Sequence, residues 1–264
     1  MAGPKQYAKR VAKSLGYDIV RRQESPTRVD SPPQSPAPSE FDPETTRLFE
    51  LVKPYTMTGI ERVAALREAV QYIVKHRIPG DIAECGVWKG GSMMAIAKTL
   101  MERNSTERSL YLFDTFEGMP PPKYVDKDIY GRDAAQIMEQ NRDRKDDDVV
   151  WAVGPLDVVK TAMAQTGYDP SRIQYVKGKV EDTIPKQAPN QIALLRLDTD
   201  WYESTYHELV HLFPRLSVGG VLIIDDYGHW QGARRAVDQY LGENRLKLLL
   251  NRIDYTARVA VKIE

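Results

Sequence analysis

Two apolar runs in the last third of the chain are each followed by a pair of aspartates, and this pattern restricts the fold more than any other. The first run covers residues 192–197 and the second covers residues 221–224. Short apolar runs of this length are typical of strands buried on both faces of a parallel sheet. Parallel strands end at one edge of the sheet, where open α/β proteins bind their ligands. Four acids should therefore meet at this edge: Asp198, Asp200, Asp225 and Asp226.

Four carboxylates at one edge repel one another, and packing them together without a cation is costly. Carboxylate oxygens are hard ligands of the kind that magnesium and calcium bind. The two acidic strand ends therefore predict a divalent metal ion.

The other segments alternate between strand and helix, which predicts a doubly wound α/β sheet with helices on both faces. We expect strands at residues 81–87, 109–113, 173–176, 192–197, 219–224, 246–251 and 255–262. We expect helices at residues 60–76, 93–101, 156–166, 203–213 and 231–242. Residues 115–150 are too long for an ordinary connection between a strand and a helix, so we interpret them as a lid over the substrate.

The first 45 residues are unlike the rest of the chain. Residues 1–24 are basic, and residues 25–43 carry many prolines among serines. Such a proline-rich segment buries too little apolar surface to order itself and is typical of a linker. We therefore divide the chain into an arm with a linker, residues 1–45, and one domain, residues 46–264. We expect the arm to be solvated or to pack in a homodimer, and we favour this over an amphipathic helix that touches a partner or a membrane surface.

Charge and cysteine content bear on compartment and partners. Lysine plus arginine and aspartate plus glutamate both number 37, so the net charge of zero gives no signal for nucleic acid. The single cysteine, Cys85, excludes an intrachain disulfide and favours a reducing compartment. No apolar stretch approaches the ~20 residues that span a bilayer, and no secretory signal is evident. We therefore expect a cytoplasmic protein that has no transmembrane segment and binds no nucleic acid.

A glycine-rich turn follows the first expected strand. Gly86, Gly90 and Gly91 let the backbone approach a ligand closely, and the free N–H groups of the next helix attract an anion. Ser92 either caps this helix or binds the anion. A tight turn without a ligand explains these residues equally well, so the turn alone does not decide.

Asp114 favours a bound nucleoside. It ends the second strand, 28 positions after Gly86, where an acid accepts the ribose hydroxyls of such a ligand. The glycine spacing G-x-x-x-G-G departs from the dinucleotide fingerprint and disfavours a nicotinamide cofactor. Glu84 suits an ammonium group, and S-adenosylmethionine offers a ribose, an ammonium group and a carboxylate. Glu181 or Asp182 would meet its adenine edge, or else would begin a helix.

Five motifs together resemble the macrocin O-methyltransferase family, bacterial enzymes that methylate sugar hydroxyls on antibiotics and related glycosides. The motifs are ECGVWKGGS at 84–92, LFDTFEGMP at 112–120, KGKVEDT at 177–183, LRLDTDWYEST at 195–205 and IIDDYGHWQGARRAVD at 223–238. The resemblance runs from about residue 55 to the C-terminus. It implies a class I methyltransferase fold, which is Rossmann-like with a seven-stranded, mostly parallel sheet. It also implies S-adenosylmethionine as the donor and dependence on Mg²⁺.

Carried over by position, the resemblance also assigns site residues. It implies three metal ligands, Asp198, Asp225 and Asp226. It implies Asp200 as the general base. Around the cofactor it places Glu84, Gly86, Ser92 and Asp114, with Glu181 and Asp182 near the adenine. Small-molecule catechol methyltransferases have a lysine base three residues after the first aspartate. Trp201 stands there in this chain, which supports a sugar hydroxyl as the target.

The expected function is therefore a magnesium-dependent methyl transfer to a sugar hydroxyl of a glycosylated natural product or glycan. Met57 and His229 are candidates for contact with the substrate. A competing interpretation takes Asp198-Thr199-Asp200 as the D-x-D motif of a glycosyltransferase that uses a nucleotide-sugar. That alternative explains neither Glu84 nor the second acid pair. A third interpretation is a non-catalytic subunit that binds a glycan or a nucleotide.

Overall fold

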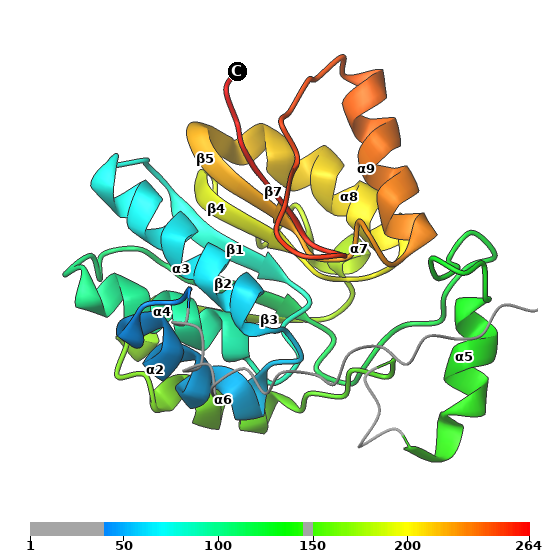
Figure 1. Cartoon of the computed structure of the whole chain (residues 1–264), viewed down its shortest axis with the longest axis horizontal. Helices are drawn as coiled ribbons and strands as arrows, with labels where there is room; N and C mark the ends of the chain where they lie inside the picture. The colour runs from blue at the N-terminus through cyan, green and yellow to red at the C-terminus, as the bar shows by residue number, and fades with distance from the viewer. Residues whose placement is uncertain (1–39, 145–149) are drawn as a thin grey trace, which may run out of the picture. The chain divides into compact units, whose positions relative to one another are not determined.

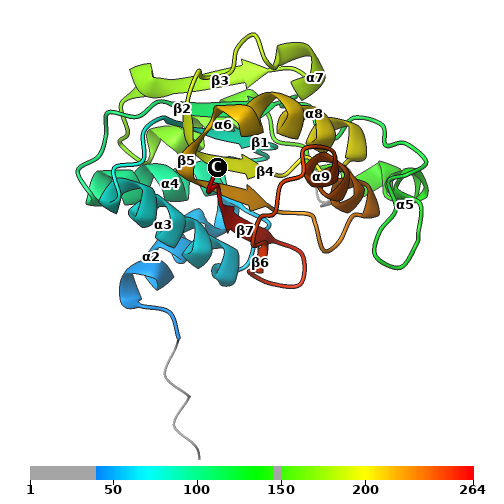
Figure 2. The same cartoon turned by 90° about the horizontal axis from the view of Figure 1, so that it is seen from above.

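The computed structural model describes residues 40–144 and 150–264, and these residues form a seven-stranded sheet in the order β3-β2-β1-β4-β5-β7-β6 (Figures 1 and 2). Within it, β1 to β5 are parallel, and β7 is antiparallel to both β5 and β6. The strands are β1 Asp81–Cys85, β2 Leu110–Asp114, β3 Ile173–Lys177, β4 Ile192–Leu197, β5 Leu216–Ile224, β6 Asn251–Arg252 and β7 Arg258–Val261. The predicted α/β class and mostly parallel sheet are confirmed.

Strand register explains why the predicted site residues meet. Strand β4 is central and buried along its whole length, as its continuous apolar run predicts. Leu197, its last residue, lies opposite Cys85 of β1 and Ile224 of β5. Three strands therefore end at the same height, and the residues that follow them share one edge of the sheet.

Helices cover both faces of the sheet (Figures 1 and 2). Among the described residues, one face carries α2 Pro43–Val52, α3 Ile60–Lys75, α4 Gly91–Glu102 and α6 Leu156–Ala164. The other face carries α7 Val180–Thr183, α8 Tyr202–Leu212 and α9 Gln231–Glu243. Each layer has its own apolar core: Leu66 and Met94 belong to the first, and Leu195 and Leu209 to the second. No helix of residues 40–144 and 150–264 combines the length and the apolar character needed to cross a bilayer.

The segment predicted as a lid contains helix α5, Ala134–Gln140, which stands apart from the sheet (Figure 1). A third, small apolar core joins Ala134 and Met138 to Trp201 and Trp230, at the starts of α8 and α9. Short 3₁₀ turns occupy Lys53–Tyr55, Arg142–Arg144, Pro170–Arg172 and Phe213–Arg215.

Three sequence expectations need comment. The strand expected at residues 246–251 is wrong, because only Asn251–Arg252 pair with β7. Leucines at 246, 248 and 250 instead pack, partly buried, against the second core. Helix α2 begins at Pro43, inside the linker segment, where the Asp42 carboxylate accepts a hydrogen bond from Thr45 N–H at 2.7 Å and caps it. The basic arm lies outside the described residues.

Candidate active site

A pocket of 550 Å³ lies at the carboxyl edge of the sheet, where the sequence predicts the site. This volume is within the range of about 300–1,000 Å³ that is usual for small-molecule sites. The pocket is lined by ten of the predicted residues: Met57, Gly86, Ser92, Asp114, Glu181, Asp198, Asp200, Asp225, Asp226 and His229. Glu84 and Asp182 do not line it.

Gly86 joins the two sides of this pocket. Its φ is 83°, and a Cβ atom built there would lie only 1.9 Å from the carbonyl oxygen of Asp198. Only glycine permits both the left-handed backbone and this close approach. The turn after β1, predicted to face the methyl donor, therefore lies directly against the acidic turn after β4.

Asp114 organises the donor side through backbone contacts. One carboxylate oxygen accepts hydrogen bonds from the N–H groups of Val87 at 2.6 Å and Trp88 at 3.1 Å. The other accepts one from Phe116 N–H at 2.7 Å. Burial raises the pKa of Asp114, and these three hydrogen bonds oppose the rise. The carboxylate thus fixes the glycine turn and lines the pocket at the same time.

Helix α4 starts at this turn, two residues earlier than predicted. Its N-cap is Gly90, with a φ of 95°, and no side chain caps its first turn. Ser92 is buried and faces the pocket instead of capping. The first N–H groups of α4 are therefore unblocked by a capping side chain, as an anion site requires.

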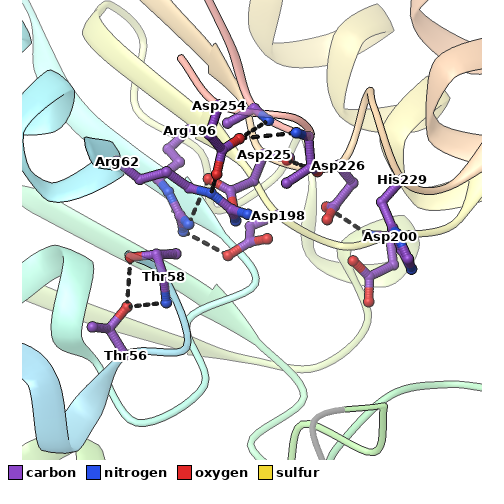
Figure 3. Close-up of polar contacts among 12 residues, drawn as sticks. Thr56, Thr58, Arg62, Arg196, Asp198, Asp200, Asp225, Asp226, His229 and Asp254 are labelled. Carbon is purple, nitrogen blue, oxygen red and sulfur yellow. Dashed lines mark hydrogen bonds and ion pairs between the residues drawn. The ribbon is translucent and has the colours of Figure 1, made fainter. Parts of the chain in front are cut away.

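Arg196 is the buried cation of the acidic side (Figure 3). Its Nη1 lies 2.5 Å from Glu84 Oε1 and 2.7 Å from Asp198 Oδ2, and its Nη2 lies 2.8 Å from Asp225 Oδ1. The arginine side chain is 4% exposed. The planar fork of a guanidinium allows one residue to contact three carboxylates that come from three strand ends.

Glu84 was expected to hold the ammonium group of the donor. In the structure it is fully buried and contacts Arg196, which itself lines the pocket. Burial raises the pKa of Glu84 to about 7, although Arg196 opposes this rise. The role of Glu84 in donor binding stays a prediction.

A second arginine binds Asp225. Arg62 of α3 contacts Asp225 Oδ2 through Nη1, and its Nε donates to Asp254 Oδ2 at 2.7 Å (Figure 3). Asp225 is therefore held between Arg62 and Arg196.

Asp198, which Arg196 also contacts, forms an acidic cluster with Asp200 and Asp226. One carboxylate oxygen of each lies within 4.8 Å of the others. Burial raises the pKa values of Asp198 and Asp226 well above their usual range, and neighbouring carboxylates add to the rise. Burial also raises the pKa of Asp200 to about 7. Because the Asp198 side chain is 27% exposed to the pocket, solvent moderates its shift.

The turn that carries Asp200 has an unusual conformation. Asp200 has a φ of 64°, a left-handed value that few residues other than glycine adopt, and its N–H donates to Asp226 Oδ2 at 3.3 Å. Beneath the turn, the Thr199 hydroxyl donates to Glu208 Oε1 at 2.8 Å. Glu208 is fully buried, and burial raises its pKa well above the usual range. These contacts direct Asp200 toward the other two acids.

The lid segment is tied to the same turn. Asp126 is fully buried, and its Oδ1 accepts a hydrogen bond from Tyr202 N–H, at the first residue of α8, at 2.8 Å. A Cβ atom at Gly232, in the first turn of α9, would lie 2.0 Å from that oxygen. Gln231 N–H donates to the Lys127 carbonyl at 2.8 Å. Residues 126 and 127 therefore connect the wall of the pocket to the starts of two core helices.

The remaining candidates occupy the rim. Met57 is 43% exposed at the pocket entrance. His229 lies on the Asp200 side of the cluster (Figure 3), 3.3 Å from the Tyr255 hydroxyl through Nδ1, and burial lowers its pKa. Glu181 and Asp182, in α7, are both exposed, and of the two only Glu181 lines the pocket.

Sequence reasoning missed four residues of this site: Arg62, Asp126, Arg196 and Glu208. Arg196 did carry a signal, since a single cation inside an otherwise apolar strand must be paired. Arg62 and Asp126 carried none, because their partners are distant in sequence and no local pattern connects them.

Comparison with known proteins identifies the family of this chain. The family model of macrocin-O-methyltransferase (TylF) matches residues 44–261. The chain is 34% identical over 202 residues to the 8-demethyl-8-(2,3-dimethoxy-alpha-L-rhamnosyl)-tetracenomycin-C 4'-O-methyltransferase of Streptomyces olivaceus, which covers 76% of this chain and 73% of that protein. It is 32% identical over 186 residues to the demethyldecarbamoylnovobiocin O-methyltransferase of Streptomyces niveus, covering 70% and 67% of the two chains.

Among solved structures, the O-methyltransferase NovP superposes with a TM-score of 0.70 at 27% identity, over 80% of this chain and 83% of that one. The chain therefore belongs to the macrocin-O-methyltransferase (TylF) family and is an S-adenosylmethionine-dependent O-methyltransferase.

Proposed function

We propose that the protein transfers the methyl group of S-adenosylmethionine to a sugar hydroxyl of a glycosylated natural product, with the help of Mg²⁺. The observation that carries this proposal is the cluster of Asp198, Asp200 and Asp226, which lies in the same pocket as the donor-side residues Gly86 and Asp114. The named substrates of the relatives in Streptomyces support the choice of a sugar-bearing acceptor.

The chemistry of the acidic cluster fits a magnesium ion. Three carboxylates within 4.8 Å of one another offer the hard oxygen ligands that this ion prefers. Their raised pKa values report the repulsion and burial that a divalent cation would offset. When bound, the ion lowers the pKa of a coordinated hydroxyl and positions it.

Asp200 is suited to receive the proton of the acceptor hydroxyl. Burial raises its pKa to about 7 in the site without a cation, so Asp200 binds a proton more readily than an ordinary carboxylate does. Its left-handed backbone and its hydrogen bond to Asp226 hold it beside the two other acids. Asp198 and Asp226 would then be the principal metal ligands.

Asp225 has two competing roles that experiment can separate. The resemblance implies that it binds the metal, whereas its contacts with Arg62 and Arg196 suit an electrostatic role beside the donor. Titrating activity with Mg²⁺ in the variants Asp225→Asn and Asp200→Asn distinguishes these roles. If the substituted residue binds the metal, the variant requires more Mg²⁺ for half-maximal rate. If the residue acts only as the general base or through its charge, the variant loses rate at every Mg²⁺ concentration.

The donor side supplies the second half of the reaction. Asp114 at the end of β2 would accept ribose hydroxyls, and the first N–H groups of α4, which no side chain caps, would bind a carboxylate. Exclusion of bulk water by a bound donor and acceptor would strengthen the attraction between an ionised hydroxyl and a cationic donor.

The decisive test is methyl transfer itself. The purified protein, given S-adenosylmethionine and Mg²⁺, should methylate at least one member of a panel of rhamnosides and other deoxysugar glycosides, detected as a mass gain of one methylene. EDTA should abolish the reaction and added Mg²⁺ should restore it. Methyl transfer that is unaffected by EDTA would refute the proposed dependence on Mg²⁺. Absence of transfer to every glycoside in the panel would refute the proposed sugar acceptor. The family match decides against the glycosyltransferase alternative.

A further inference from the structure

A second groove, of 890 Å³, adjoins the active site. It lies between residues 124–129 of the lid segment and the first half of α9. His229 and Trp230 line both the groove and the pocket, so the two cavities meet at this pair of residues. A ligand that places a sugar beside the acidic cluster would reach the groove with whatever is attached to that sugar.

The groove is electropositive. Three basic side chains line it, Lys127, Arg234 and Arg235, against one acid, Asp238. Within residues 40–144 and 150–264, none of the three cations forms an ion pair with a carboxylate. The charges of the whole chain balance, so three cations against one acid give this groove a local excess of positive charge.

Neighbouring contacts hold the two arginines in place and leave their charge available. Arg234 Nε donates to the Tyr227 carbonyl at 3.0 Å, and its guanidinium lies 5.3 Å from the centroid of the Tyr227 ring. The Arg235 guanidinium lies 5.5 Å from the Tyr202 ring centroid. Asp238, one turn after Arg234, accepts a hydrogen bond from the Tyr227 hydroxyl at 2.8 Å.

The rim of the groove is aromatic and apolar. Tyr124 is 80% exposed and Ile129 is 46% exposed, and both line the groove. An exposed aromatic ring beside cations suits a ligand that combines an anion with a flat ring system.

We infer that this groove binds a phosphate ester carried by the acceptor, on the part of the acceptor remote from the hydroxyl that is methylated. The inference rests on the proposed function and narrows it to anionic acceptors. Arginine and lysine recognise phosphate through charge-assisted hydrogen bonds, and the tyrosine at the rim offers a surface for a base or an aglycone ring. Two sources share this chemistry: a sugar still attached to a nucleoside diphosphate, and a finished glycoside that carries a phosphate.

Kinetics with matched acceptors test the inference. Nucleoside diphosphate rhamnose, rhamnose 1-phosphate and methyl rhamnoside present the same sugar with different attachments. The phosphate-bearing acceptors should have the lower KM, and added salt should raise their KM more than that of the methyl glycoside. A lower KM for nucleoside diphosphate rhamnose than for rhamnose 1-phosphate would show that the acceptor sugar is attached to a nucleoside diphosphate. Equal KM values for these two acceptors would show that the groove recognises only the phosphate. Equal KM values for charged and neutral acceptors would overturn the inference.

Substitutions locate the effect in the groove. Lys127→Gln and Arg235→Gln should each raise the KM for a phosphate-bearing acceptor about tenfold, the value of one hydrogen bond to a charged group. The KM for methyl rhamnoside and kcat should not change. Arg103→Gln, at the exposed end of α4 and outside both cavities, is the matched control and should have no effect. A KM rise that is the same for charged and neutral acceptors would show a structural effect and contradict the inference.

A binding measurement keeps the inference separate from catalysis. Uridine diphosphate, titrated by calorimetry in EDTA so that no metal links it to the acidic cluster, should bind the wild type about tenfold more tightly than the Lys127→Gln variant. If uridine diphosphate binds in this way but no glycoside is methylated, phosphate binding by the groove is supported and the proposed function is refuted. Absence of binding, or equal affinity of the wild type and the variant, would refute the inference that the groove binds phosphate.

Discussion

Replacing Arg196 with methionine should destabilise the protein strongly, and more at alkaline than at acidic pH. The guanidinium lies within 2.8 Å of carboxylate oxygens of Glu84, Asp198 and Asp225 and is 4% exposed. Methionine fills much of the same volume without charge. Removing one partner of a buried ion pair costs about 3–5 kcal/mol, because the remaining charge stays buried without compensation.

The pH dependence follows from Glu84. Its pKa in the folded protein, about 7, exceeds its ordinary value of 4.5, so the folded state holds the proton more tightly than the unfolded state. Stability from this group is therefore complete below pH 4.5 and is lost as pH rises through the folded pKa. Without Arg196 that pKa rises further, so the cost of the substitution should grow by about 1 kcal/mol between pH 6 and pH 8.

Urea denaturation of the wild type and the variant at pH 6 and pH 8 measures both quantities. Arg215→Met is the matched control, since Arg215 donates only to the carbonyls of Ala188 and Pro189, at 3.0 and 2.9 Å, and to that of Pro185 at 3.4 Å. It should cost about 1–3 kcal/mol, and this cost should not grow between pH 6 and pH 8 as that of Arg196→Met does. The double variant Glu84→Gln, Arg196→Met should recover part of the loss at pH 8.

Two results would refute this reasoning. A loss below about 1 kcal/mol at pH 8 would mean that solvent or the acids themselves neutralise the cluster without the arginine. A large loss that is equal at pH 6 and pH 8, and equal to that of Arg215→Met, would mean that packing alone explains it.

Three further outcomes follow from the site. Asp226→Asn should raise the Mg²⁺ concentration for half-maximal activity by about tenfold to a hundredfold, with rate recovered at high Mg²⁺; an unchanged titration would place the ion elsewhere. Asp114→Asn leaves backbone N–H groups facing an amide and should weaken S-adenosylhomocysteine binding about tenfold by calorimetry, so unaltered affinity would exclude its donor role. Gly232→Ala places a Cβ 2.0 Å from Asp126 Oδ1 and should cost about 1–3 kcal/mol in urea denaturation. Gly242→Ala, in the same helix with nothing within 4 Å, should instead stabilise by about 0.5–1 kcal/mol, and similar values for both glycines would contradict the predicted clash.

The sheet and its acidic edge were predictable because they depend on local patterns. Continuous apolar runs fix buried strands, and parallel strands must bring their following residues to one edge. This reasoning brings all four acids to one edge. In the structure Asp198, Asp200 and Asp226 cluster there, whereas Asp225 contacts Arg62 and Arg196. The glycine turn and Asp114 were likewise recognised from their spacing along the chain.

Contacts between distant segments were not predictable in the same way. Arg62 and Asp225 are separated by 163 positions, and nothing in either local sequence indicates that they pair. For the same reason, the sequence does not show that two arginines hold Asp225, or that Asp198 joins Arg196 to the cluster with Asp200 and Asp226. The alternating leucines at 246–250 show the converse, because an alternating pattern reports which side chains are buried but not whether the backbone finds a partner.

The attachment of residues 126 and 127 to the starts of α8 and α9 limits how this enzyme can be redesigned. Exchanging residues 115–140 with those of a relative, as one would to alter acceptor choice, leaves the donated segment facing helix ends that evolved with a different loop. A glycine at position 232 without an aspartate at 126 would leave a gap. An aspartate at 126 beside a larger residue at 232 would give a steric clash. Successful chimeras should therefore transfer three pieces as one unit, the loop and the opening turns of both helices.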